Sequence, residues 1–453
     1  MRVGFVGLGK LGLPVAVCMA QRHDVMGTDI NPLRMTKDDP QYIEAGPNGD
    51  GDFQQHLALA DKLIFGTLDQ VVAFADLIFV AVQTPHDPKY EGITPIGGEP
   101  KDFDYSYLKE AVTDIVRYVE RPTIIAIIST VLPGTMRREI IKLGNENTTF
   151  VYNPQFIAMG TVMRDFLYPE FVLMGFERNG NRANAVKRMQ EFYQRTLPVK
   201  VNLRCMSYES AELSKVAYNT MISSRLAVMN VLQELCYKLQ GADFEDVSVT
   251  LKNANRRIIS TAYMSAGIGD GGACHPRDNI AMSWLSRACG LTYNVFEQAM
   301  VAREQYAKFI ADLAVTEAMC HPNKDLYMLG YAYKPNTNIT TGSHALLIAH
   351  FVEKIQARTE HLSLKETFLF QKHDPYIEGM QKPVDVDHAR VYLIGCNHNA
   401  VITQRFPRGS VIIDPFHCIP PRKGLKVVPL GKPIVDGLDY NDLGVIETKE
   451  NEP

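Results

Sequence analysis

The chain has 453 residues, of which 46% are hydrophobic and 22% charged, and its formal net charge at pH 7 is −4. This length allows two to four domains, and the near-neutral charge excludes a general attraction to nucleic acid or to an anionic membrane. The eight cysteines form no CxxC pair, so we expect no metal site and no disulfide framework. Scattered thiols are typical of a reducing compartment, and we expect a cytoplasmic protein.

The first twenty residues are apolar enough to resemble a signal peptide. Glycines and Pro14 interrupt them, and a polar strand follows in place of a cleavage site. No later run approaches the ~18 uninterrupted apolar residues that a spanning helix needs. We therefore expect a soluble intracellular protein.

Residues 3–29 carry the pattern of a dinucleotide-binding fold. A β-branched run over 3–6 is followed by GLGKLG at 7–12, a helical pattern to about residue 21, and a strand over 25–28 that ends at Asp29. In this motif the first glycine makes a tight turn, the second admits a pyrophosphate, and the third allows close helix–strand packing. Asp29 would accept hydrogen bonds from ribose hydroxyls and repel a 2′-phosphate, which favours NAD over NADP. The alternative, a chance glycine-rich turn, leaves the strand, helix and acidic residue at these spacings unexplained.

The alternation of strands and helices then continues. Strands are predicted at 63–65, 77–82, 123–128 and 149–152, which indicates a parallel, doubly wound sheet. Ligands bind beyond the carboxyl ends of strands in such sheets. The polar stretches 82–85 and 129–135 stand at such ends, although ordinary turn chemistry is an equally good interpretation of each. An irregular loop is expected over 86–104.

One long helix without Gly or Pro is predicted from Tyr208 to about Leu239. Its length exceeds that of a usual element in a compact domain, so we interpret it as a spine between two halves and as a candidate dimer surface. Lys215 and Asn219 are four residues apart and share one face of it. The alternative is a solvated lysine beside an incidental asparagine. Further helices are expected after Phe244.

The last third of the chain begins a second alternating series. Strands are predicted at 326–329, 368–370, 391–394 and 411–413, without a GxGxxG motif, so we expect a second α/β domain that binds a different ligand. The polar tail after about Leu443 is expected to be disordered.

Residues 269–278, GDGGACHPRD, place one cysteine in a glycine-rich turn before a helix predicted over 279–288. The glycines let the backbone approach a ligand closely. Positive charge nearby, such as that of Arg277, favours a thiolate. Cys274 is therefore a candidate covalent nucleophile. The alternative is a tight turn that carries a buried cysteine.

Seven stretches now stand in order along the chain: GLGKLGLP (7–14), QTP (83–85), STVLPGT (129–135), NPQFIAMG (153–160), ELSKVAYN (212–219), GGACHPRD (271–278) and GYAYKPNT (330–337). Together they resemble the UDP-glucose/GDP-mannose dehydrogenase family over nearly the whole chain. The resemblance implies two Rossmann-like doubly wound α/β domains joined by a long helix and a helical central domain. The implied parts are an NAD-binding domain over 1–203, a central dimerisation domain over 204–305 and a nucleotide-sugar-binding domain over 306–453.

The resemblance also implies a reaction, in which NAD oxidises the C6 primary alcohol of a nucleotide sugar such as a UDP-sugar to a carboxylate. Two hydride transfers pass through a thiohemiacetal and a thioester on the cysteine, and the products serve polysaccharide synthesis. The implied catalytic residues are Cys274, Lys215, Asn219, Asp278 and Thr130. The implied cofactor-binding residues are Gly7, Gly9, Lys10, Leu11, Gly12, Asp29, Arg34, Thr84 and Thr130. The implied substrate-binding residues are Gln155, Phe156, Lys215, Asn219, Arg257 (or Arg256, reaching the substrate of the other subunit of a homodimer), Gly271, Tyr333 and Lys334.

The chain departs from the family pattern at several places. Gln155 and Met159 stand where the family usually has glutamates, and an amide cannot take a proton at neutral pH, so the expected base for thioester hydrolysis is missing. Arg277 replaces a lysine, and the stretches at 341, 396–399 and 416–417 also differ. Two alternatives therefore stay open. One is a two-electron oxidation of a related alcohol that stops at the aldehyde, and the other is a nucleotide-sugar-binding protein without catalysis.

Overall fold

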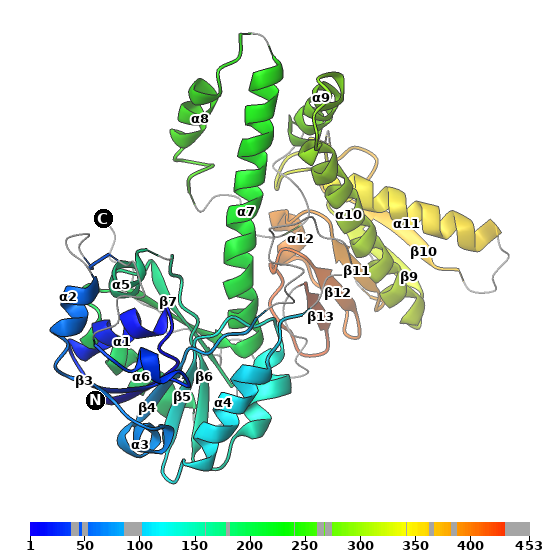
Figure 1. Cartoon of the computed structure of the whole chain (residues 1–453). Coiled ribbons are helices and arrows are strands. Elements are labelled where there is room, and N and C mark those ends of the chain that lie inside the picture. The colour runs from blue at the N-terminus through cyan, green and yellow to red at the C-terminus, as the bar shows by residue number, and fades with distance from the viewer. Residues whose placement is uncertain are drawn as a thin grey trace. The chain divides into compact units, whose positions relative to one another are not determined.

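The computed structural model describes residues 1–37, 45–47, 53–85, 102–158, 160–177, 182–239, 241–260, 267, 274–340, 342–361, 367–381 and 387–430. The chain divides into two compact units, Met1–Ser224 and Arg225–Pro453, and each contains one sheet (Figure 1). The fold class is as predicted, with two α/β units and a long helix. The predicted limits of three domains stay predictions.

The first unit contains an eight-stranded sheet in the order β3-β2-β1-β4-β5-β6-β7-β8. Its strands are β1 (Arg2–Val6), β2 (Asp24–Thr28), β3 (Leu63–Phe65), β4 (Leu77–Val80), β5 (Thr123–Ile127), β6 (Thr148–Tyr152), β7 (Phe171–Phe176) and β8 (Asn202–Ser207). Its helices are α1 (Gly12–Ala20), η1 (Pro32–Arg34), α2 (Phe53–Ala58), α3 (Leu68–Phe74), α4 (Ser106–Arg117), η3 (Met136–Ile140), η4 (Ile141–Leu143), α5 (Val162–Leu167), α6 (Arg182–Thr196) and the first part of α7 (Tyr208–Lys238).

One strand pair of this sheet differs from the predicted parallel arrangement. β7 runs antiparallel to β6, while the other neighbouring pairs are parallel. The connection between them contains the six-residue helix α5. Because the pair is antiparallel, β7 begins at the edge of the sheet where β6 ends.

Helices cover both faces of the first sheet (Figure 1). Val3, Phe5 and Phe79 pack into one core with α1, α2, α5 and α6. Val6 and Val80, which point to the opposite face, pack into a second core with α3, α4, η3 and the start of α7. Because both faces are buried, the central strands β1, β4 and β5 consist mainly of apolar residues. Six of the eight strands were predicted from the sequence.

The second unit contains a parallel sheet in the order β10-β9-β11-β12-β13. Its elements are the second part of α7, α8 (Phe244–Lys252), α9 (Cys274–Ala288), α10 (Val295–Cys320), β9 (Asp325–Leu329), α11 (His344–His361), β10 (Leu369–His373), β11 (Val391–Ile394), α12 (Asn399–Thr403), β12 (Val411–Asp414) and β13 (Lys426–Pro429). Side chains of α10 and α11 pack on one face of this sheet, and α12 packs on the other.

Helix α9 begins at Cys274, five residues before the predicted start at 279. The prediction treated Pro276 as the end of a turn. Pro276 is instead the third residue of the helix, where a missing N–H costs nothing because the first N–H groups of a helix have no partner within it. Cys274 is therefore the first residue of a helix.

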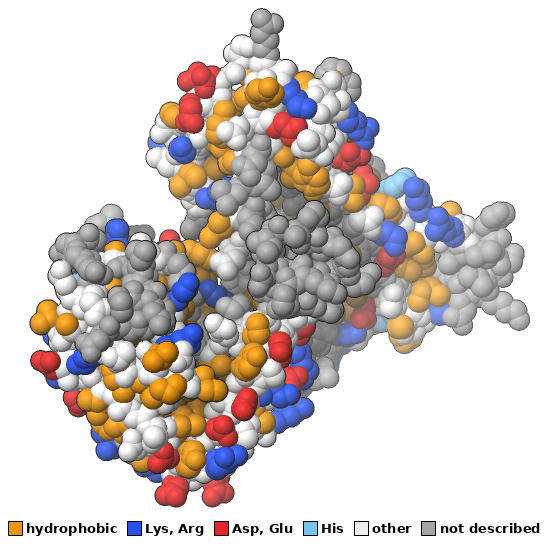
Figure 2. All heavy atoms as spheres, in the orientation of Figure 1, with side chains coloured by type: hydrophobic (Ala, Val, Ile, Leu, Met, Phe, Trp, Pro, Cys, Tyr) orange, Lys and Arg blue, Asp and Glu red, His pale blue; other side chains and the backbone are white. Residues whose placement is uncertain are grey.

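Acidic and basic side chains are interspersed on the face shown in Figure 2, in agreement with the net charge of −4. Among the described residues, no helix has both the length and the apolar character that a membrane span requires. Several predictions lie outside the described residues, namely most of the loop at 86–104, the tail after Leu443, and Met159, Gly271 and Thr341.

Candidate active site

The loop between β1 and α1 has the backbone geometry that the glycine motif predicts. Gly7 has a φ of +95°, and a Cβ atom there would lie 2.7 Å from the carbonyl oxygen of Ala81. A Cβ atom on Gly12 would lie 1.9 Å from the carbonyl oxygen of Gly7. At Gly9 the nearest atom would be Nη1 of Arg34, 3.9 Å away, so the loop is open where a pyrophosphate has to approach. The chain thus fits a dinucleotide here.

We expect Gly12→Ala to lower both the melting temperature and the affinity for NAD, because the new methyl group forces α1 away from the loop, at a cost of about 1–3 kcal/mol or more. Gly9→Ala is the matched variant. Its methyl group fits the free protein but blocks the pyrophosphate, so it should weaken NAD binding and leave the melting temperature unchanged. Calorimetric titration with NAD and a thermal melt measure both quantities. Unaltered NAD affinity in both variants would contradict this role of the loop.

Asp29 is fixed at the end of β2, where its side chain is 3% exposed. Its Oδ2 accepts a hydrogen bond from the amide of Leu8 at 2.7 Å, and its Oδ1 accepts from the amide of Asn31 at 2.8 Å. Nη1 of Arg34 lies 3.5 Å from Oδ2. Each carboxylate oxygen keeps acceptor capacity for a ribose hydroxyl. The two predicted residues, Asp29 and Arg34, are therefore together beside the glycine loop, which also contains Lys10 and Leu11.

The polar stretches at the ends of β4 and β5 meet, as the sheet edge predicts. The Thr84 hydroxyl donates to the Thr130 carbonyl oxygen at 2.7 Å. A residue to which no role had been given, Glu212 of α7, holds the second stretch in place. Its buried carboxylate accepts from the amides of Gly134 and Met136, each at 2.6 Å, and burial raises its pKa. Glu212 lies within the ELSKVAYN stretch, one helical turn before Lys215, and that spacing was an available signal.

Lys215 is buried and lies next to two other predicted residues. Its Nζ donates to the Gln155 carbonyl oxygen at 2.6 Å and lies 4.6 Å from the centre of the Phe156 ring. The Phe156 ring packs edge-on against Phe171 and Tyr218. Burial lowers the pKa of the Lys215 ammonium. Asn219, one helical turn further along α7, is exposed.

The Gln155 side chain belongs to a buried hydrogen-bond network. Its Nε2 donates to the Asn153 carbonyl oxygen at 3.1 Å and lies 3.1 Å from the Tyr193 hydroxyl. That hydroxyl donates to Oδ1 of Asn153 at 2.5 Å, and Asn153 donates in turn to the Leu173 carbonyl oxygen. Burial raises the pKa of Tyr193. No motif pointed to Tyr193, because it is 38 residues from Gln155.

The second sheet repeats the turn-and-carboxylate arrangement of the first without the glycine motif. Gly330 follows β9 with a φ of +88°. Oδ2 of Asp374, after β10, accepts from the amide of Tyr331 at 2.6 Å, and Oδ1 accepts from the amide of Tyr376 at 2.8 Å. Leu8 and Asn31 make the same two contacts with Asp29. The likeness supports the prediction of a second ligand-binding α/β domain.

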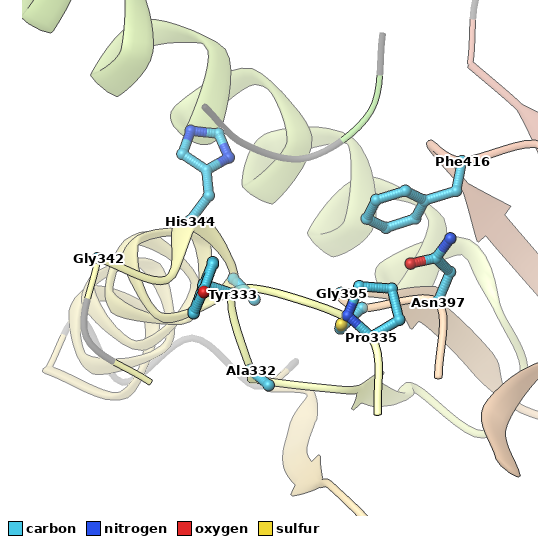
Figure 3. Close-up of a pocket in the computed structure, with 10 residues that line it drawn as sticks. Ala332, Tyr333, Pro335, Gly342, His344, Gly395, Asn397 and Phe416 are labelled. Carbon is cyan, nitrogen blue, oxygen red and sulfur yellow. The ribbon is translucent and has the colours of Figure 1, made fainter. Parts of the chain in front are cut away.

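A pocket with a cavity volume of about 50 Å³ opens at the carboxyl edge of the second sheet (Figure 3). Its lining comes from the loops after β9, β11 and β12 and from the start of α11: Ala332, Tyr333, Pro335, Gly342, His344, Ala345, Gly395, Cys396, Asn397 and Phe416. Of the predicted substrate residues, Tyr333 lines the pocket, and Lys334 lies beside it in sequence with an exposed side chain.

The remaining candidates lie in the helical segments of the second unit. Cys274 is the first residue of α9. The side chains of Cys274 and Asp278 are outside the described part of the chain. Arg256 and Arg257 follow α8 and are exposed. Among the described residues, no group of three or more His, Cys, Asp or Glu residues could hold a metal ion.

Comparison with known proteins gives two family matches. The profile of the UDP-glucose/GDP-mannose dehydrogenase family, NAD binding domain, matches residues 1–197, and that of the central domain of the same family matches residues 209–304. The first match confirms the prediction of NAD as the cofactor.

Individual relatives agree with these matches. UDP-glucose 6-dehydrogenase TuaD of Bacillus subtilis is 25% identical over 366 residues, covering 79% of this chain and 75% of the relative. UDP-glucose 6-dehydrogenase of Rickettsia conorii is 26% identical over 353 residues, or 77% of each chain. A crystal structure of a ternary complex of GDP-mannose dehydrogenase from Pseudomonas aeruginosa has the same fold, with a TM-score of 0.77 and 19% identity over 94% of this chain and 99% of that one.

Proposed function

This chain belongs to the UDP-glucose/GDP-mannose dehydrogenase family and is an NAD-dependent oxidoreductase, and on that premise we propose that it oxidises the C6 primary alcohol of a nucleotide sugar to the carboxylate. The proposed reaction consumes R–CH2OH, two NAD⁺ and water, and releases R–COO⁻, two NADH and three protons. Bound NAD supplies the hydride acceptor for each oxidation. The observation that carries the proposal is the buried Lys215 ammonium, which lies against Gln155 and Phe156 on the unit that binds NAD.

We assign to Lys215 and Asn219 the stabilisation of the charge that develops on the alcohol oxygen. As hydride leaves, that oxygen loses its proton and charge develops on it. An ammonium and an amide stabilise this charge, and one such donor is often worth ~3 kcal/mol. A fixed position matters because the donor then needs no reorganisation during the reaction. The hydrogen bond to the Gln155 carbonyl and the Phe156 ring provide that fixed position for Lys215.

Cys274 is assigned as the nucleophile of the second oxidation. Its thiolate adds to the aldehyde carbon to form a thiohemiacetal, which loses the second hydride to become a thioester. Water then attacks the thioester, and the thiolate leaves. The start of α9 favours the thiolate at both the attack and the departure.

The release of the acid is the step at which this chain departs from the pattern that the family resemblance implies. Gln155 has an amide that cannot act as a base, and its NH2 group faces Asn153 and Tyr193. We assign Gln155 to the positioning of Lys215 through its carbonyl oxygen, and we assign the orientation of water to Asp278 and Thr130. Without that base the reaction could stall at the thioester, after both hydrides have left. A two-electron oxidation that stops at the aldehyde stays the second candidate.

The nucleotide part of the substrate is assigned to the second unit. The pocket at the end of the second sheet, with Tyr333 in its lining and Lys334 next to it, is the candidate for the nucleotide. Arg257 and Gly271 are proposed to contact the phosphates or the sugar. The relatives named UDP-glucose 6-dehydrogenase favour a UDP-sugar.

We also propose that the protein is a cytoplasmic homodimer. Exposed apolar side chains on α7 to α9, such as Tyr237 and Ile280, support the dimer. Light scattering tests it, because the mass of one chain is 50.8 kDa.

The number of NADH molecules formed per substrate consumed tests the proposal. Purified protein is incubated with NAD and a panel of nucleotide sugars, and NADH, aldehyde and acid are measured. We expect two NADH and one acid per UDP-sugar. One NADH with accumulated aldehyde would favour the two-electron reaction. Binding without any NADH would leave a nucleotide-sugar-binding protein and refute the proposal.

A further inference from the structure

We propose that His398 is a positioning residue that fastens the Lys334 loop, residues 330–337, and thereby sets the affinity for the nucleotide sugar. The proposal rests on the proposed function in one respect, namely that this loop contacts the substrate. His398 follows β11, precedes α12 and is 0% exposed. It does not line the pocket, whereas its neighbours Cys396 and Asn397 do.

The two ring nitrogens of His398 have different partners. Nδ1 accepts a hydrogen bond from the amide of Asn336 at 2.8 Å, and Nε2 lies 3.1 Å from Oδ2 of Asp374. A backbone N–H can only donate, so Nδ1 carries no proton and Nε2 carries one. The neutral ring with the proton on Nε2 therefore satisfies both partners at once, and both His398 and Asp374 are fully buried.

The two partners hold opposite ends of the Lys334 loop. Asp374 also accepts from the amides of Tyr331, at 2.6 Å, and Ala332, at 3.2 Å, at the start of the loop. Asn336 stands near the end of the loop. Because His398 bonds to both Asp374 and Asn336, one imidazole links the two ends across the loop.

Asn336 is a specific attachment point rather than an incidental contact. Its φ of +58° is a left-handed conformation, which asparagine tolerates better than most residues. Its Oδ1 accepts from the amide of Asn399 at 3.0 Å, next to the bond that its own amide makes with His398. The Thr337 hydroxyl donates to the carbonyl oxygen of Lys334 at 2.9 Å. The position of Asn336 thus sets that of Lys334, two residues earlier.

Asp374 depends on His398 in turn. Burial opposes ionisation of this carboxyl, yet the hydrogen bond from His398 and those from the backbone amides hold its pKa below the usual value. When a fully buried carboxylate loses one of its hydrogen-bond donors, the folded state loses stability. Removal of the imidazole therefore loosens both attachments of the loop.

The experiment tests the hydrogen bonds of the two ring nitrogens of His398 separately. In His398→Asn the side-chain oxygen can replace Nδ1, and in His398→Gln the side-chain NH2 can replace Nε2. His398→Ala removes both, and His321→Ala is the control for loss of a buried imidazole in the same unit, because His321 contacts Gly409 and Asn323 instead. Amide hydrogen exchange over residues 331–337 is measured without substrate. KM and kcat are measured with UDP-glucose as the probe substrate and with NAD.

We expect His398→Ala to speed exchange of the loop and to raise KM for UDP-glucose about 10-fold. The kcat value and KM for NAD should stay within about 2-fold, since the NAD loop is in the other unit. His398→Asn should keep the Asn336 amide protected and most of the substrate affinity. His398→Gln should protect the amides of Tyr331 and Ala332 but not that of Asn336. If the alanine variant does not fold, the Asn and Gln variants carry the test.

Several results would overturn the inference. They are unaltered exchange in His398→Ala, equal loss in His321→Ala, protection of Asn336 in His398→Gln, or faster exchange without a change in KM. If the wild-type protein oxidises no nucleotide sugar, the proposed function fails on its own. The exchange measurement then still decides whether His398 fastens the loop, since it uses no substrate.

Discussion

Cys274→Ala is expected to abolish acid formation, with a loss of at least about 10³-fold, while NAD still binds. Without the thiolate, the aldehyde has no covalent partner and the second hydride transfer has no thiohemiacetal to start from. In the proposed reaction the first oxidation uses Lys215 and Asn219 but no thiolate, so a single turnover should yield aldehyde and one NADH. Chemical trapping of aldehyde and quantification of acid after a fixed time distinguish these products.

The control for this change is Cys289→Ala. Cys289 is half-buried directly after the end of α9, so its removal tests the general effect of losing a thiol from the same segment. It should leave acid formation within about 2-fold. An undiminished acid yield in Cys274→Ala, or an equal loss in both variants, would rule out Cys274 as the nucleophile.

Lys215→Met is expected to lower the rate of the first oxidation by about 10²- to 10³-fold, because the developing charge on the alcohol oxygen loses its cation. Lys238→Met is the control, since Lys238 is on the same helix and contacts Glu234 and the Gly290 carbonyl oxygen. The single-turnover rate of NADH formation measures the effect. Equal rates in the two variants would contradict the assignment of Lys215.

The lowered pKa of Lys215 predicts how the stability and the activity of the wild-type protein change with pH. Burial lowers the pKa of Lys215 below its ordinary value of 10.5, so the folded protein binds this proton less tightly than the unfolded chain. Wild-type stability relative to Lys215→Met should therefore rise with pH between the lowered pKa and about 10.5. The ammonium to which we assign the first oxidation loses its proton as the pH rises through the lowered pKa. The alkaline limb of kcat/KM should accordingly begin below pH 10.5.

Sequence periodicity predicted several strands that are apolar on both faces and the turns that need glycine. β1, β4 and β5 are continuous apolar runs, and Gly7 and Gly12 have the roles that the motif assigns to them. It did not predict β8, an edge strand whose alternate residues are exposed and polar. It did not predict β7 either, although that strand is apolar and buried, and its antiparallel pairing with β6 was not predicted.

Some contacts of the candidate site were also predictable from the sequence, and others were not. Residues within one motif, such as Asp29 with the glycine loop, were predictable because strand order fixes their neighbours. Contacts between distant segments were not, and Tyr193 with Gln155 and His398 with Asn336 are examples. These contacts depend on where two chain segments pack, and a single sequence does not record that.

The Asn153–Gln155–Tyr193 network has a consequence for engineering. A carboxylate introduced as Gln155→Glu would face the two oxygens of Asn153 and the Tyr193 oxygen, whose only proton is already directed at Asn153. The new side chain would take up a proton or turn away, and in neither case would it gain a base at that place. A glutamate-type hydrolytic centre is therefore several substitutions from this chain, and an engineer would have to rebuild the whole cluster together.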